Sequence, residues 1–376
     1  MMAAHSVIHM IRPRPAGEVG GADLHVADLA EAQRSRRSSV AVVSFGNPEY
    51  TAMLRQRGID AIEVNGDHMR AWYRVTARAI VDRQPDVLHS HGYRADMIAA
   101  ALRRWSWKGR DCRPALVMSI HGFIRTGVAF RTLTYLNERC LPAADLVITT
   151  SSAEADRLAH GRYPPARFIP NGVRPAPSAS RDLLTAAVGM EAAQRVAFIG
   201  RLSPEKRPDL FVQMAALVRE RYPDCLFVII GTGPLESVTR RLAERLGVAD
   251  RVRFAGLRRD VGQLLRGVDV LVCPSDSEGT PRVAVEAMLS GVPVVATRVG
   301  GLPDLITDSV TGMLVEPGSP HPLADAVRYL LDDPKAAQRI GMAGAAQALS
   351  PFSIDHMERQ VAEVYAEARE LARADP

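Results

Sequence analysis

Cysteine, lysine and long apolar runs are scarce in this sequence. Its 376 residues include four widely spaced cysteines and no C-x-x-C pair, which favours a reducing compartment over a disulfide framework or a zinc site. No stretch approaches the length of a membrane span, and the apolar run at the start is too short for a signal peptide. We therefore expect a cytoplasmic protein.

Two cofactor signatures are also missing. The glycine loop after the first apolar run is not G-x-G-x-x-G, so a nicotinamide-dependent dehydrogenase is disfavoured. No Asp-x-Asp triad is placed for a divalent ion. We expect neither a cofactor nor a metal.

The basic charge is uneven and almost entirely arginine. Residues 1–172 hold 23 Arg and Lys against 16 Asp and Glu, whereas the remainder is slightly acidic. The segment 103–110, with two tryptophans among basic residues, suits an anionic lipid surface, although a solvated helix end is the plainer interpretation. No nucleic-acid motif accompanies the charge, so nucleic acid is not an expected partner.

Short apolar runs alternate with helical patterns along the whole chain, which predicts parallel sheets covered on both faces. The predicted strands are 7–11, 40–43, 61–64, 86–89, 115–118, 146–148 and 167–169, then 196–199, 226–230, 252–254, 270–273, 294–296 and 313–315. Helical patterns lie between them, for example at 24–34, 72–82, 93–104 and 130–140. The fold class is α/β.

Turn-forming residues at 170–177 separate two such patterns. We predict one domain over 1–172, a second over 173–355, and a helix over 356–376 that returns to the first domain. Two doubly wound sheets in series would face each other across a closing cleft.

The segment 277–288 is the most informative stretch of the chain. It lies between two predicted strands and reads as a loop feeding a helix, with Thr280 as the cap and Pro281 at the first helical position. A helix start at the carboxyl edge of a parallel sheet binds anions. Glu278 would lie at the ligand side of this helix start, beside Gly279.

Glu286 falls inside the apolar part of the same segment. A buried carboxylate needs donors, and a vicinal diol supplies two. The alternative is a surface ion pair with Arg282, one helical turn earlier.

Other strand ends carry further candidates. Gly200, Arg201 and Lys206 follow one predicted strand, where two cations suit a diphosphate leaving group; the alternative is a surface loop neutralised by Glu205. His121 follows a strand of the first half and could bond a sugar hydroxyl or exchange a proton, or merely cap the strand.

Glycines mark the remaining strand ends. They allow a backbone to approach a phosphate or a base closely, although each could also be a tight turn. These candidate donor-binding positions are Gly20, Gly21, Gly231, Gly233, Gly256 and, beside the last, Leu257.

Together these motifs, in this order and spacing, resemble the retaining glycosyltransferases of family 4, which have the GT-B fold of two facing Rossmann-like domains. The motifs are Gly20-Gly21, His121-Gly122, 171–173, 200–202 with Lys206, 231–234, and the acids Glu278 and Glu286 with seven residues between them. Asp23, where the family commonly has Glu, and Arg282, where an apolar residue is more usual, depart from the pattern.

The resemblance implies that the domain over 1–172 binds the acceptor and that the domain over 173–355 binds the nucleotide-sugar. It also implies a role for each matching position. Arg201 and Lys206 would bind the diphosphate of a nucleotide-sugar, Glu286 the ribose hydroxyls, and Glu278 with Gly279 and Thr280 the donor sugar. Gly20 and Gly21 would approach the phosphates, and His121 would contact the sugar near the reacting carbon.

The resulting expectation is metal-independent, retaining transfer of a hexose from a nucleoside-diphosphate sugar, UDP-linked by family frequency, to an acceptor hydroxyl. The acceptor could be a small molecule or a lipid-linked glycan, and the candidate wall residues are His25, His91, Arg94 and Arg125. A nucleotide-sugar epimerase and a non-catalytic partner protein are the alternatives.

Overall fold

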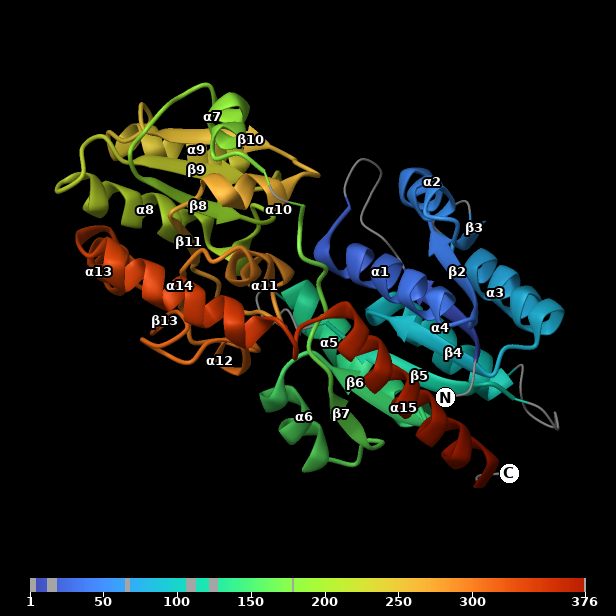
Figure 1. The fold of residues 1–376 in the computed structure, drawn as a ribbon. Helices are drawn as coiled ribbons and strands as arrows, with labels where there is room; N and C mark the ends of the chain where they lie inside the picture. The colour runs from blue at the N-terminus through green and yellow to red at the C-terminus, as the bar shows by residue number, and fades with distance from the viewer. Residues whose placement is uncertain are drawn as a thin grey trace. The chain divides into compact units, whose positions relative to one another are not determined.

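The computed structural model describes residues 5–11, 19–64, 68–105, 113–121, 128–177 and 179–374. The chain divides into two compact units (Figure 1). Unit 1 comprises residues 1–172 together with 354–376, and unit 2 comprises residues 173–353.

Unit 1 is built on a seven-stranded, all-parallel sheet in the order β3-β2-β1-β4-β5-β6-β7. The strands are β1 (Ser6–Ile11), β2 (Ser39–Phe45), β3 (Asp60–Val64), β4 (Val87–His91), β5 (Ala115–Ile120), β6 (Leu146–Thr149) and β7 (Ala166–Phe168). The helices are α1 (Gly21–Ser35), α2 (Pro48–Gln56), α3 (Met69–Arg83), α4 (Tyr93–Trp105), α5 (Val128–Cys140), α6 (Ser152–Ala159) and α15 (Ile354–Ala374).

Both faces of this sheet are buried, which explains why its strands are apolar throughout rather than alternating. Successive residues of β1 point to opposite sides: Val7 joins a cluster with Tyr365 of α15, and Ile8 joins one with Trp72 of α3. The last helix of the chain therefore covers one face of the first unit, beside α1 (Figure 1).

Unit 2 has a six-stranded parallel sheet in the order β10-β9-β8-β11-β12-β13. Its strands are β8 (Arg195–Ile199), β9 (Leu226–Ile230), β10 (Val252–Gly256), β11 (Val270–Cys273), β12 (Val294–Thr297) and β13 (Met313–Val315). Its helices are α7 (Asp182–Val188), α8 (Pro208–Arg219), α9 (Glu236–Arg245), α10 (Val261–Leu264), α11 (Arg282–Leu289), α12 (Leu302–Leu305), α13 (Pro320–Asp332) and α14 (Pro334–Ala348).

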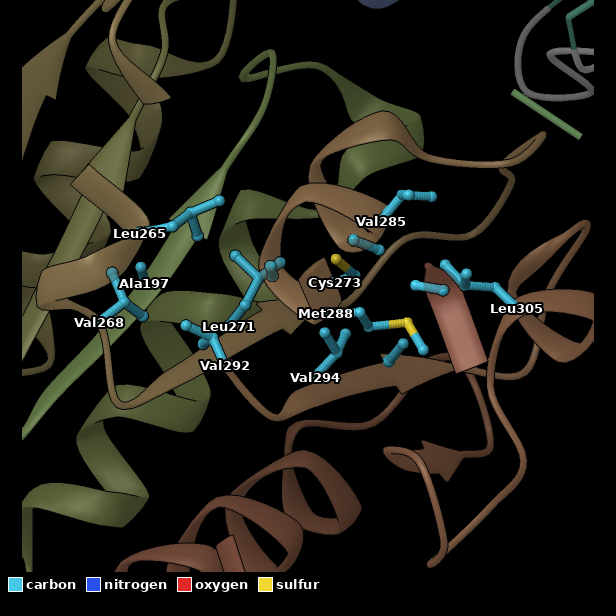
Figure 2. Packing of buried hydrophobic residues seen from close by; sticks show 14 of the residues in the cluster. Ala197, Leu265, Val268, Leu271, Cys273, Val285, Met288, Val292, Val294 and Leu305 are labelled. Carbon is cyan, nitrogen blue, oxygen red and sulfur yellow. The ribbon is translucent and has the colours of Figure 1, made fainter. Parts of the chain in front are cut away.

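Helix α11 is fixed to the sheet by its apolar face. Val285 and Met288 are buried with Cys273 of β11 and Val294 of β12 in one cluster (Figure 2). Burying each side chain of this size stabilises the fold by roughly 1.5–3 kcal/mol, so the start of α11 is held firmly at the strand ends.

The prediction of two doubly wound parallel sheets is confirmed, and each apolar run predicted as a strand is one. One boundary was wrong: α11 begins at Arg282, and Pro281 takes the cap position that we assigned to Thr280. Proline has no side-chain acceptor, so this helix start has no side-chain cap.

Each strand order reverses once, between β1 and β4 in unit 1 and between β8 and β11 in unit 2. At such a switch point the two adjoining loops leave the sheet in opposite directions and open a crevice for a ligand.

Candidate functional site

The loops after β8 and β11 are tied together at the switch point of unit 2. The Asp276 amide donates to the Glu205 carbonyl over 2.8 Å, and the Arg207 guanidinium lies 3.1 Å from the Asp276 carboxylate. These contacts hold the loop that carries Lys206 beside the loop that carries Glu278.

Lys206 and Glu278 form the central contact of this site. The Lys206 Nζ lies 2.6 Å from Oε1 and 2.5 Å from Oε2 of Glu278, and the Ser275 hydroxyl donates to Oε1 over 2.7 Å. The carboxylate is only 7% exposed, whereas the lysine is 25% exposed. The ammonium group has three N–H donors and its side chain is a quarter exposed, so it can donate to an anion while it holds the carboxylate.

The acid that neutralises Lys206 in the 200–207 loop is Glu278, and binding of a diphosphate by Arg201 and Lys206 stays a prediction. Glu205, which we considered as a neutralising partner, instead accepts from the Ser203 hydroxyl over 2.6 Å. Ser275 was missed, since nothing in the sequence distinguishes a serine after a strand from an ordinary turn residue.

The Glu278 charge also affects the pKa of Cys273. Burial, followed by the nearby Glu278 charge, raises the pKa of Cys273 to about 12. The Cys273 thiol at the end of β11 therefore stays protonated and has no nucleophilic role.

The glycines of the neighbouring loops pack against one another. A β-carbon on Gly231 would overlap the Gly200 carbonyl, and one on Gly233 would overlap the Leu202 main chain. The Leu202 amide also donates to the Thr232 carbonyl over 3.0 Å. Close approach between loops thus explains these glycines without a ligand, and contact with a donor stays a prediction for them.

Gly256 ends β10 with φ of +66°, and the next residue, Leu257, is 45% exposed. The Gly231 amide donates to the Gly256 carbonyl over 2.8 Å, which joins this turn to the same set of loops. A nucleobase contact at Gly256 and Leu257 stays a prediction.

Glu286 lies inside α11, one turn after Arg282, and their charged groups are 3.8 Å apart. The pair that we weighed as an alternative is present, but it is no surface pair, because the side chains are only 10% and 20% exposed. At this distance the contact is an ion pair rather than a hydrogen bond, and binding of ribose hydroxyls by Glu286 stays a prediction.

The candidates of the first half lie at the switch point of unit 1. Gly20 precedes α1, and its amide donates to the Asp23 carboxylate over 2.6 Å. Asp23, which we noted as a departure from the family pattern, thus closes the helix start as a capping acid. Gly21 is the first, exposed residue of α1.

His121 follows β5 and joins a cluster of buried imidazoles. Its Nε2 lies 3.1 Å from Nδ1 of His91, and its ring centre lies 4.7 Å from that of His25. Burial lowers the pKa of His121 to about 4, so the ring is neutral at physiological pH. His9 and His89, which complete the cluster, were missed because they lie inside apolar strand patterns.

The basic segment proposed for membrane contact is only partly described, since residues 106–112 lie outside the described ranges. The candidate wall residue Arg125 also lies outside them. Arg103 is engaged with the buried Asp145 over 2.5 Å, and Trp105 is exposed. A bilayer-crossing helix is not found in the part of the chain that the structure describes.

Known proteins that are similar to this chain indicate its family. Two family models match, "Glycosyltransferase Family 4" over residues 19–176 and "Glycosyl transferases group 1" over residues 190–347. A D-inositol 3-phosphate glycosyltransferase of Kribbella flavida is 33% identical over 88% of this chain and 87% of its own length. The chain belongs to the group 1, family 4 glycosyltransferases.

Other proteins named D-inositol 3-phosphate glycosyltransferase match this glycosyltransferase with different identities and over different lengths. That of Streptomyces avermitilis is 30% identical over 95% of this chain and 85% of its own. That of Corynebacterium glutamicum strain R is 42% identical, but over 39% of this chain and 37% of its own.

Solved structures confirm the GT-B fold of this glycosyltransferase. Anabaena HepE in complex with UDP-glucose superposes with a TM-score of 0.83 at 23% identity, covering 96% of this chain and 99% of that one. Sucrose-phosphate synthase of Thermosynechococcus elongatus gives 0.81 at 20% identity, covering 98% and 100%. At these identities the likeness concerns the fold alone.

Proposed function

We propose that this glycosyltransferase moves a hexose from a UDP-sugar to an acceptor hydroxyl with retention of configuration and without a metal ion. The observation that carries the proposal is the Lys206–Glu278 pair at the switch point of unit 2. It holds an ammonium group where a diphosphate would bind, on the same loop as Arg201. HepE, a protein of the same fold, has been crystallised with UDP-glucose, which supports a UDP-sugar as the donor.

In this mechanism the bond from the anomeric carbon to the diphosphate oxygen breaks first, and charge builds up on the diphosphate. Lys206 and Arg201 stabilise that charge, as a divalent ion does in other phosphate-transfer sites. The acceptor oxygen bonds to the anomeric carbon on the face that the diphosphate leaves, and the hydroxyl proton passes to the departing phosphate oxygen. The intermediate state resembles an oxocarbenium ion.

The second carboxylate has another task. Glu286 would accept hydrogen bonds from both ribose hydroxyls, so we do not assign it as a covalent nucleophile of the kind used by retaining glycosidases. Glu278 with Gly279 and Thr280 would contact the donor sugar, and His121 would contact it from the first unit.

The acceptor belongs to the same proposal. Cell-envelope glycans, glycolipids and natural products fit the basic first unit, and peripheral contact with an anionic membrane is part of this proposal. D-inositol 3-phosphate enters the acceptor panel because several relatives carry it in their names.

The test is a titration of the full chain with a panel of nucleotide-sugars, followed by turnover with candidate acceptors, each with and without EDTA. We expect one UDP-sugar to bind, unaffected by EDTA, and to lose at least about tenfold in affinity in Lys206→Ala. Lys335→Ala, an exposed lysine on α14, is the matched control. Binding that Lys206→Ala leaves unchanged would contradict the site, and inversion at the anomeric carbon would contradict the stereochemistry.

The same panel separates the alternatives. An epimerase would convert the free nucleotide-sugar without any acceptor, and a non-catalytic partner protein would bind it without conversion.

A further inference from the structure

A chain of hydrogen bonds runs through unit 1 from α1 to the end of β5. Gln33 Oε1 lies 2.8 Å from His9 Nε2, His9 Nδ1 lies 3.0 Å from His91 Nε2, and His91 Nδ1 lies 3.1 Å from His121 Nε2. Each ring uses one nitrogen for each neighbour, so the four side chains form a single file.

The sheet brings these residues together. His9 of β1 pairs in register with His89 of β4, so both lie in one row across the strands. His91 follows two residues later and points to the same face. Helix α1 lies over that face and supplies Gln33.

The rings in the file are neutral. Burial lowers the pKa of His9 to about 4 and that of His91 well below its ordinary value. A neutral imidazole has one donor and one acceptor nitrogen. In a file of neutral rings, every hydrogen bond therefore runs from donor to acceptor in the same direction. The group at the end of the file fixes that direction.

Gln33 is that end group. Its amide oxygen faces His9 and can only accept, while its amide nitrogen donates to the Tyr365 hydroxyl of α15 over 3.2 Å. His9 must then donate from Nε2, and so must His91 and His121 in turn. His121 Nδ1 is left without a proton, and among the described residues this buried atom has no hydrogen-bond partner.

We propose that Gln33, His9 and His91 are positioning residues that hold His121 as its Nε2-protonated tautomer, with Nδ1 as an acceptor for a ligand hydroxyl. A buried acceptor without a donor is costly, and a hydroxyl of the bound sugar or acceptor would satisfy it. The inference deepens the proposed function and rests on the role given there to His121.

The cluster could also be taken for a metal site, because nitrogens of His9, His89 and His91, and likewise those of His25, His91 and His121, lie within 4.8 Å of one another. Both groups need a nitrogen of His91, and both His91 nitrogens are engaged by His9 and His121. Their hydrogen bonds argue otherwise. His89 Nδ1 lies 2.7 Å from the Tyr365 hydroxyl and its Nε2 lies 2.7 Å from the Ser119 hydroxyl. The network thus accounts for these nitrogens without an ion.

Nitrogen NMR of the full chain labelled with ¹⁵N-histidine tests the tautomers directly. We expect protonated Nε2 and unprotonated Nδ1 signals for His9, His91 and His121, unchanged by EDTA. Gln33→Leu removes the end group and should give His121 a mixture of tautomers. Ser119→Ala, which loses a contact of His89 outside the file, should leave His121 unchanged.

A protonated Nδ1 on His121 in the wild type would overturn the proposal, as would spectra altered by EDTA. The wild-type measurement needs no variant, so it stands even if Gln33→Leu fails to fold. An unchanged His121 tautomer in folded Gln33→Leu would also overturn it.

Kinetics then separate this inference from the proposed function. If both hold, Gln33→Leu lowers kcat about tenfold and leaves the Kd for UDP unchanged, because UDP lacks the sugar that His121 contacts and the groups of unit 2 are untouched. A wild type with the expected tautomers but no transferase activity would reject the proposed function, and the assignment of the His121 tautomer would stand. Full activity in a Gln33→Leu protein with mixed tautomers would reject the positioning role alone.

Discussion

Gly300 lies so close to Glu278 that a β-carbon on the glycine would overlap the main-chain carbonyl oxygen of Glu278. Gly300 has φ of +54°, and the Gly301 amide donates to the Gly279 carbonyl over 3.2 Å. The loop that carries Glu278 is thus held against the loop after β12 by a main-chain contact that only glycine permits.

We predict that Gly300→Ala pushes the Glu278 loop away and costs about 2 kcal/mol or more of unfolding free energy. Affinity for UDP should fall by about tenfold. Chemical denaturation and a UDP titration measure the two effects. Gly318→Ala is the control, because Gly318 has φ of +93° but nothing within 4 Å of its β-carbon position. An equal loss of affinity in the control would refute the loop argument.

The Lys206–Glu278 pair predicts a coupling energy. Lys206→Met leaves a nearly buried carboxylate with Ser275 as its partner, and Glu278→Gln leaves the lysine without its acid. Each single variant should lose about 1–3 kcal/mol of stability, and the double variant should lose about 1–2 kcal/mol less than their sum. Urea denaturation of the four proteins measures the cycle. Additive losses would mean that the pair contributes nothing.

Asp96 at the start of α4 predicts a pH-dependent effect. Burial raises its pKa to about 7, against the hydrogen bond from the Ser90 hydroxyl, which lowers it. The folded chain therefore binds a proton that the unfolded chain has released above about pH 4. Stability from this group is complete below that pH and is lost as pH rises towards 7.

Asp96→Asn mimics the protonated acid and keeps an acceptor for Ser90. We expect it to stabilise the protein by about 1–3 kcal/mol more at pH 8 than at pH 5, relative to wild type. Thermal unfolding at both values measures the difference. Asp60→Asn, on an exposed acid paired with Arg83, should show no such change between the two values. A gain confined to pH 5 would reverse the assigned sign.

Glu286 predicts discrimination between ribose and deoxyribose. If its carboxylate accepts both ribose hydroxyls, UDP should bind about tenfold more tightly than 2′-deoxy-UDP, and Glu286→Ala should bring the ratio towards one. Arg282→Met, which removes the neighbouring charge 3.8 Å away, should preserve the ratio. A ratio that Glu286→Ala leaves intact would remove Glu286 from the ribose site.

The sequence predicted the strands well because burial on both faces leaves a continuous apolar run that few other elements produce. It also predicted that Lys206 and Glu278 follow strand ends. Their direct contact depends on β8 lying beside β11, which joins residues 72 positions apart in the chain. That adjacency is a property of the sheet order.

The histidine cluster shows where such reasoning stops. His9 and His89 each interrupt an apolar strand and look like isolated buried histidines. Only the register that places His9 opposite His89 brings their rings to one face. Pattern and spacing do not report register between strands, so the file of hydrogen bonds that ends at His121 could not be predicted.

Helix α15 sets an order of events during synthesis. Every residue of unit 2 has been translated before Met357 and Tyr365 of α15 are added to the chain. One face of the unit 1 sheet, around Val7 and Val117, must wait for Met357 and Tyr365. The unit that the ribosome begins first is therefore the one whose core is completed last.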